Sequence, residues 1–93
     1  MSDEPSVPLG TVDFSTHVLS VASSAMVALG KIPGPDGQTI PVELETAKFL
    51  IEVLAMLETK TKGNLDEAEQ RLLASLLYDL RVGFVDAQRT TTR

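Results

Sequence analysis

The chain has 93 residues, the size of one domain, and its 13 acidic and 8 basic residues give a formal net charge of −5. This acidic balance repels phosphate backbones and anionic lipids, so we expect neither a nucleic-acid partner nor a membrane partner. The absence of cysteine and the single histidine exclude disulfides, thiolate metal sites and multi-histidine sites. Scarce aromatic residues and abundant leucine favour an all-α fold.

Residues 1–12 contain Pro5, Pro8 and Gly10 among polar residues and predict a flexible N-terminal segment. This segment lacks the basic region and the long apolar run of a secretion signal. The chain also offers no run of about 18 continuous apolar residues, the length that spans a bilayer. We therefore expect a cytoplasmic protein.

The first helix is expected over residues 14–29. Asp13 is its expected N-cap, with Ser15 as the alternative, and Gly30 suits the left-handed position after its last turn. Apolar residues fill about half of its circumference, and no acidic or basic residue occurs within it. Because surface helices ordinarily carry charge on the wet side, we expect this helix to be covered on more than one side. His17 is expected to make a partly buried polar contact, since the sequence places no carboxylate or second ligand near it.

Prolines and glycines in residues 30–41 predict a loop. Its Pro35-Asp36-Gly37 step is a turn signal, because proline presets φ and glycine accepts positive φ; a short two-stranded hairpin is the alternative. A second helix follows over residues 43–62, with apolar residues at heptad spacing. A second apolar row lies beside that seam and consists of Phe49, Val53 and Met56.

The third helix is expected over residues 65–87, where leucines make one broad face. Asn64 and Glu67 resemble a capping box at its start. The connection after Gly63 is so short that the second and third helices should form an antiparallel hairpin. Gly83 lies on the core side, where we expect another helix to approach closely. A single helical domain over residues 13–87 and a flexible tail over residues 88–93 complete the expected organisation.

The width of the apolar faces predicts self-association. A lone three-helix bundle hides an apolar stripe slightly wider than about 100° on each helix. The apolar faces of the first two helices are wider than this. A fully buried leucine or valine contributes roughly 1.5–3 kcal/mol, so leaving the surplus exposed would be costly for a small domain. We therefore expect a homodimeric helical bundle. The expected interface consists of Phe14, Val18, Val21, Ala22, Ala25, Met26, Leu29, Phe49, Val53 and Met56.

Two further surfaces are candidates for binding. Tyr78, Val82 and Val85 follow i, i+4, i+7 spacing on the back of the third helix, which suits either a further oligomer contact or a docking surface for another protein. Lys60 and Lys62, with Asn64, would suit a phosphate at the N-terminus of the third helix, although capping explains these residues without a ligand. The carboxylates of the second and third helices lack the Glu-x-x-His motif of di-metal bundles and predict a solvated face.

Three blocks of the sequence resemble a bacterial family catalogued as domain of unknown function 1844. The most specific block resembles the family's hairpin signature and consists of Lys60, Thr61, Lys62, Gly63, Asn64 and Leu65. The other two resemble its opening and closing helices, namely Phe14-Ser15-Thr16, Ser20 to Ala25 and Leu29-Gly30, then Leu72-Leu73, Leu76-Leu77, Leu80-Arg81 and Phe84-Val85. The departures are His17, in place of an apolar residue, and the loop rich in proline and glycine. The resemblance implies a short helical protein, and it brings no established reaction, ligand or partner.

These features favour a non-enzymatic, self-associating interaction or adaptor protein that needs no cofactor. The sequence has no nucleophile–base spacing, phosphate loop or metal cluster that would indicate an enzyme. One alternative is a carrier of a small apolar ligand between the helices, suggested by the surplus apolar surface with Met26 and Met56. Another is peripheral membrane attachment through the first helix. The lack of lysine and arginine in this helix argues against that alternative.

Overall fold

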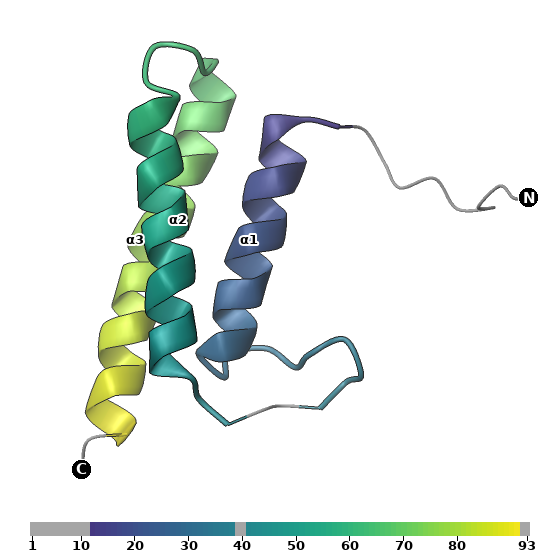
Figure 1. The fold of residues 1–93 in the computed structure, drawn as a ribbon, viewed down its shortest axis with the longest axis vertical. Coiled ribbons are helices and arrows are strands. Elements are labelled where there is room, and N and C mark those ends of the chain that lie inside the picture. The colour runs from purple at the N-terminus through teal and green to yellow at the C-terminus, as the bar shows by residue number, and fades with distance from the viewer. Residues whose placement is uncertain (1–11, 39–40, 92–93) are drawn as a thin grey trace, which may run out of the picture.

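The computed structural model describes residues 12–38 and 41–91, which form three helices and no strand. The helices are α1 (Phe14–Ala28), α2 (Leu44–Lys60) and α3 (Glu67–Thr91), and each of them contacts the other two. Figure 1 shows α1 beside α2, with the loop between α2 and α3 at the top, from which α3 returns alongside α2. The all-α expectation is confirmed for the described residues. Most of the N-terminal segment expected over residues 1–12 lies outside them.

Local signals at both ends of α1 act as expected. The Oδ1 atom of Asp13 accepts a hydrogen bond of 2.7 Å from the Thr16 N–H, which caps the helix and holds the pKa of Asp13 below its usual value. At the other end Gly30 has a φ of 75°. The amides of Gly30 and Lys31 then donate to carbonyls in the last turn of α1, in a Schellman arrangement.

The loop after α1 turns at the expected Pro-Asp-Gly step. The Gly37 N–H donates to the Gly34 carbonyl at 2.8 Å, and Gly37 has a φ of 82°. The Asp36 side chain accepts from the Gln38 N–H at 3.1 Å, which fixes the same turn. The described residues of the loop form no strand, so the hairpin alternative is not seen there. The loop closes where the Glu43 N–H donates to the carbonyl of Ala28, the last residue of α1.

The start of α3 differs from the expected capping box. The box is formed by Asp66 and Glu69, whose side chains accept from each other's backbone N–H at 2.8 and 3.0 Å. The prediction of a box formed by Asn64 and Glu67 was wrong. The Asn64 N–H instead donates to the Thr61 carbonyl in the turn after α2. The C-terminal expectation also changes, since α3 extends to Thr91 instead of ending at Ala87.

The core lies where the three helices meet, and no polar or charged side chain of the described residues is buried in it. Several of its α1 members are alanines, whose small side chains let the other helices approach closely. Burial of the larger members contributes roughly 1.5–3 kcal/mol each. The core residues are Val18, Ala22, Ala25, Ala28 and Leu29 from α1 and its end, Ala47, Ile51 and Leu54 from α2, and Leu73, Leu77, Leu80 and Ala87 from α3.

Candidate interaction surfaces

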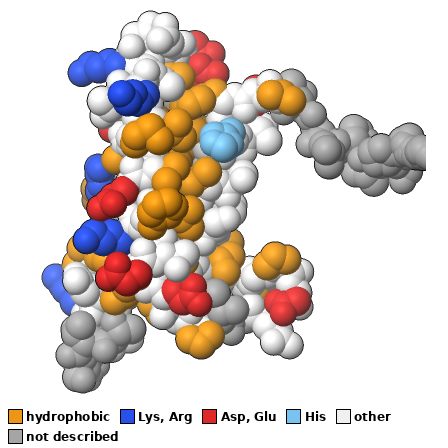
Figure 2. All heavy atoms as spheres, in the orientation of Figure 1, with side chains coloured by type: hydrophobic (Ala, Val, Ile, Leu, Met, Phe, Trp, Pro, Cys, Tyr) orange, Lys and Arg blue, Asp and Glu red, His pale blue; other side chains and the backbone are white. Residues whose placement is uncertain are grey.

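An exposed apolar row runs along α2 and consists of Phe49, Val53 and Met56, here called the α2 row. Phe49 is 65% exposed, Met56 is also exposed and Val53 is half-buried. The spacing i, i+4, i+7 brings the three side chains onto one face of the helix. Figure 2 shows a stripe of hydrophobic side chains down this side of the molecule, bordered on one flank by charged groups. The single chain leaves this row in contact with solvent.

The side of α1 that faces away from the core carries no charge. The 15 residues of α1 include no Asp, Glu, Lys or Arg, and its outer positions are mainly serine and threonine. His17 is exposed, which corrects the expectation of a partly buried contact. In Figure 2 the histidine, drawn pale blue, lies at the edge of the hydrophobic stripe. The exposed part of α1 thus adjoins the α2 row as an uncharged surface.

A second apolar surface lies on the outside of α3, here called the α3 surface, and consists of Tyr78, Val82 and Val85. All three side chains are exposed, Tyr78 to 69%. They border a shallow hollow of about 740 Å³ that also includes Met26 of α1. These residues lie opposite the leucines that α3 contributes to the core, as the sequence predicted.

The expected interface residues divide into three groups in the structure. Val18, Ala22, Ala25 and Leu29 are buried by their own chain, so this arrangement leaves them unavailable to a second copy. A second group, Phe14, Val21 and Met26, is partly buried against the core. Of the ten expected interface residues, only the three of the α2 row lie outside the core cluster and its partly buried shell. A dimer interface would therefore be centred on α2.

The family model described as Domain of unknown function (DUF1844) matches residues 11–86 of the 93-residue chain. The chain belongs to this family. The match confirms the resemblance to this family. No curated protein and no solved structure matches the chain. Its family membership therefore brings no assigned activity.

The hairpin signature of the DUF1844 domain, Lys60 to Leu65, spans the end of α2 and the turn that follows. The Thr61 hydroxyl donates to the Leu57 carbonyl at 2.7 Å, and Gly63 has a φ of 88°, which accounts for glycine there. The first turn of α3 is occupied by the Asp66–Glu69 box and also contains Glu67. A phosphate at this helix N-terminus would meet three carboxylates, so the structure favours a turn-forming role for the signature over an anion site.

Neither a cluster of metal ligands nor a membrane-spanning helix is found in residues 12–38 and 41–91. No group of three or more His, Asp or Glu side chains in these ranges is placed to hold a metal ion. No helix there is both long and apolar enough to cross a membrane. The carboxylates of Glu45, Glu52 and Glu58 on α2 are exposed, as expected for a solvated face.

An ion pair ties the end of α1 to α3, and we expect it to make stability depend on pH. The Lys31 Nζ atom lies 2.8 Å from Asp86 Oδ2, and this hydrogen bond and charge hold the pKa of Asp86 below its usual value of 3.8. A lowered carboxyl pKa stabilises the folded state above pH 3.8, and this contribution is lost as the pH falls through the folded-state pKa. Lys31→Gln should therefore unfold at lower urea concentration than the wild type at neutral pH, and the difference should vanish in acid.

Urea unfolding, followed by circular dichroism from neutral pH into acid, measures the difference in stability between Lys31→Gln and the wild type. The matched control is Lys48→Gln, because Lys48 makes no ion pair within the described part of the chain. Added salt should also shrink the Lys31→Gln difference, since the pair is exposed and screened by ions. A difference between Lys31→Gln and the wild type that persists unchanged below the folded-state pKa would contradict the assignment.

The sequence did not predict a cleft between α2 and α3, which is lined by Ile51, Ala55 and Phe84, with Lys48 and Arg81 among the flanking residues. On α2 alone, Lys48 belongs to a solvated face and Ile51 to a core face. The cleft depends on which residues of α3 stand opposite them, and that register cannot be read from either helix by itself. The only available signal was the alternation of charged and apolar residues along this flank of α2.

Proposed function

We propose that this DUF1844 domain is a non-enzymatic, self-associating helical protein, a homodimer whose subunits meet through the α2 row and the adjoining surface of α1. The observation that carries the proposal is the α2 row itself, an exposed phenylalanine and methionine with a half-buried valine between them, beside a helix without charge. Burying apolar surface gains about 25 cal/mol per Å². Burial of the neighbouring surface of α1 would strip water from no acidic or basic side chain, the kind of group that costs most to bury.

The side chains around the α2 row also suit helix packing between two copies. Ser20, Ser23 and Ser24 on α1 are small, so the backbone of a partner helix would approach closely. Charged residues border the hydrophobic stripe on its other flank in Figure 2, as in interfaces that have an apolar centre and a polar rim. The α2 row would then form the centre of the interface, with Phe49 as its largest anchor.

The α3 surface would remain free in such a dimer, because its residues belong neither to the α2 row nor to α1. Its exposed tyrosine and valines would offer a docking site for a different protein. The dimer would then be an adaptor with two such sites, one on each subunit. Tyrosine is among the residues enriched in protein interfaces, since it combines apolar area with a hydroxyl. The α3 surface is an apolar ridge flanked by the charges of Asp79 and Arg89. A protein that docks there would need an apolar surface with charges complementary to these two.

Sedimentation equilibrium at micromolar concentration tests the homodimer. The wild type should have about twice the chain mass of 10.0 kDa, and Phe49→Glu should weaken the dimer by at least about thirtyfold, because central aromatic anchors contribute roughly 2 kcal/mol or more. Val82→Glu is the matched control, because it makes the same kind of change on the α3 surface and should leave the dimer intact. Circular dichroism would verify that both variants stay helical. A wild-type mass of 10.0 kDa, or dissociation by Val82→Glu but not by Phe49→Glu, would sink the proposal.

A further inference from the structure

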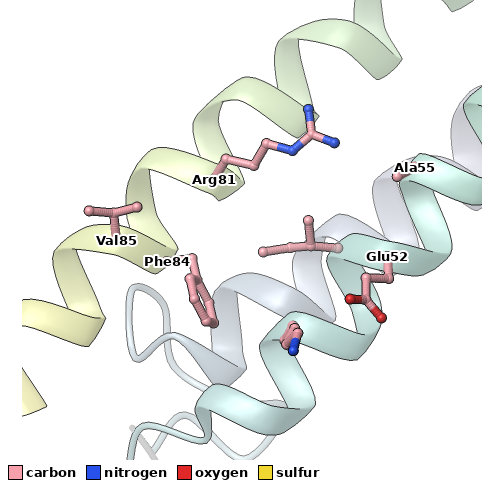
Figure 3. A pocket seen from close by; sticks show the side chains of 7 residues that line it. Glu52, Ala55, Arg81, Phe84 and Val85 are labelled. Atoms are coloured by element: carbon pink, nitrogen blue, oxygen red, sulfur yellow. The ribbon is translucent and has the colours of Figure 1, made fainter.

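The cleft between α2 and α3 differs in chemistry from both exposed apolar surfaces described above, and Val85 of the α3 surface forms one of its edges. Its volume is about 260 Å³, and it shares no residue with the α2 row. Figure 3 shows Phe84 and Arg81 of α3 turned toward the space that Glu52 and Ala55 of α2 border. The residues that line the cleft are Lys48, Ile51, Glu52, Ala55, Arg81, Phe84 and Val85.

The floor of the cleft is apolar and already held in place by the core. Ile51 is a member of the core cluster, and Ala55 and Phe84 are partly buried against it. A ligand would therefore bury its own apolar surface without first having to order these side chains. The volume is below the range of roughly 300–1,000 Å³ that is typical for drug-sized ligands, so the cleft suits one narrow chain better than a fused ring system.

Two cations flank this floor from opposite helices. Lys48 is on α2 and Arg81 is on α3, and neither side chain makes an ion pair or a hydrogen bond within the part of the chain that the structure describes. Glu52 lines the same cleft and makes no ion pair with any described residue, although an arginine faces it from the other helix. The cations outnumber the carboxylate two to one at this cleft, in a chain whose net charge is −5. The local charge therefore favours a singly charged anion.

We propose that this cleft binds an aliphatic carboxylate, a single-chain amphiphile with one negative charge. The alkyl chain lies on Ile51, Ala55 and Phe84, and the carboxylate is held between Lys48 and Arg81. A guanidinium binds a carboxylate with two parallel hydrogen bonds, which fits the head group to Arg81. A purely apolar occupant would leave both cations unmatched, whereas one negative charge balances the net charge of Lys48, Arg81 and Glu52.

Calorimetric titration with hexanoate, octanoate and decanoate, each below its micelle concentration, tests the proposal. One ligand should bind per chain, and each added methylene should tighten binding up to about fourfold until the cleft is full. Amide chemical-shift changes should centre on Ile51, Ala55 and Phe84. Octanol should bind more weakly than octanoate, and an octyl ammonium salt more weakly still. Octanol binding as tightly as octanoate, or shifts centred elsewhere, would overturn the assignment.

Charge-neutralising variants separate the cleft from general electrostatic attraction. Arg81→Gln and Lys48→Gln should each weaken octanoate binding by about two- to fivefold, the range expected for a solvent-exposed charge pair. Glu52→Gln should strengthen it by a similar factor, because a repelling carboxylate is removed. The control is Arg89→Gln, which removes the same charge from α3 outside the cleft. Equal weakening by Arg89→Gln and Arg81→Gln would overturn the proposed head-group contact.

A variant that fills the cleft gives a second readout. Ala55→Leu should abolish octanoate binding, and its helical content should stay that of the wild type, because leucine is a good helix former. Phe49→Glu should bind octanoate as the wild type does, since the α2 row is not part of the cleft. A failed octanoate titration would therefore leave the homodimer proposal intact. A monomeric wild type would likewise leave the proposed carboxylate site in the cleft intact.

Discussion

Leu54→Ala should destabilise the domain by about 2–5 kcal/mol, the usual cost of removing most of a buried leucine side chain and leaving a cavity. Leu54 is 0% exposed and belongs to the core between the three helices. A domain of this size has roughly 5–15 kcal/mol of stability in total, so this one substitution removes a large share of it. The melting temperature should fall by about 4–8 °C for each kcal/mol lost.

Leu19→Ala is the matched control, because it deletes the same atoms at a position on α1 that is 45% exposed. Its expected cost is below about 1 kcal/mol, since part of that side chain remains in water and no closed cavity forms. Urea unfolding of both variants must use one protein concentration, because association would make the stability concentration-dependent. Equal losses in the two variants would show that a single chain does not form the core described for it.

The helix ends show how far local signals carry a prediction. Asp13 and Gly30 act at the positions that their chemistry indicates, because a cap or a left-handed residue depends only on its immediate neighbours. The start of α3 was harder, since Asn64 with Glu67 and Asp66 with Glu69 have the same spacing. Which pair forms the box depends on the turn after α2. That turn uses the backbone N–H of Asn64 for a hydrogen bond to Thr61, so α3 begins after it.

The C-terminal end of α3 shows a different limit. Residues 88–91 carry no apolar periodicity, and this predicted a flexible tail. No glycine or proline follows Ala87, however, so the sequence offers nothing that would stop the helix there. The backbone of α3 continues to Thr91, and Thr90 donates its hydroxyl to the carbonyl of Asp86 one turn earlier. Apolar pattern therefore locates the packed part of a helix better than it locates the helix end.

The candidate surfaces could be predicted only in part. Helical periodicity identified the α2 row and the α3 surface, because each depends on the spacing within one helix. The apolar arc of α1 was also read correctly, but periodicity does not say what covers it. Val18, Ala22 and Ala25 are covered by their own chain, since the alanines allow α2 and α3 to pack closely. The cleft at Arg81 needed the register between two helices and was missed for the same reason.

Gly83→Leu should weaken the domain by about 1–3 kcal/mol through overpacking, offset by up to about 1 kcal/mol because glycine is a poor helix former. A Cβ atom on Gly83 would lie 3.3 Å from Leu29 Cδ1 and 3.7 Å from Lys31 Cε. Leu29 is buried and has little room to move, so a larger side chain would push the end of α1 away from α3. The element that approaches Gly83 is thus the end of α1, whereas the sequence predicted only that some helix would do so.

A series of substitutions separates this close approach from helix propensity. Gly83→Ala should be nearly neutral, because its gain in propensity is opposed by the tight contact with Leu29. The control Ser75→Leu places the same leucine at an exposed position of α3, where only the propensity gain should appear. Gly83→Leu should also lose the acid sensitivity that Lys31 and Asp86 confer, because the displaced end of α1 carries Lys31 away from its partner. Thermal unfolding of the three variants decides the matter, and an unchanged melting temperature in Gly83→Leu would show that the two segments are not held this close.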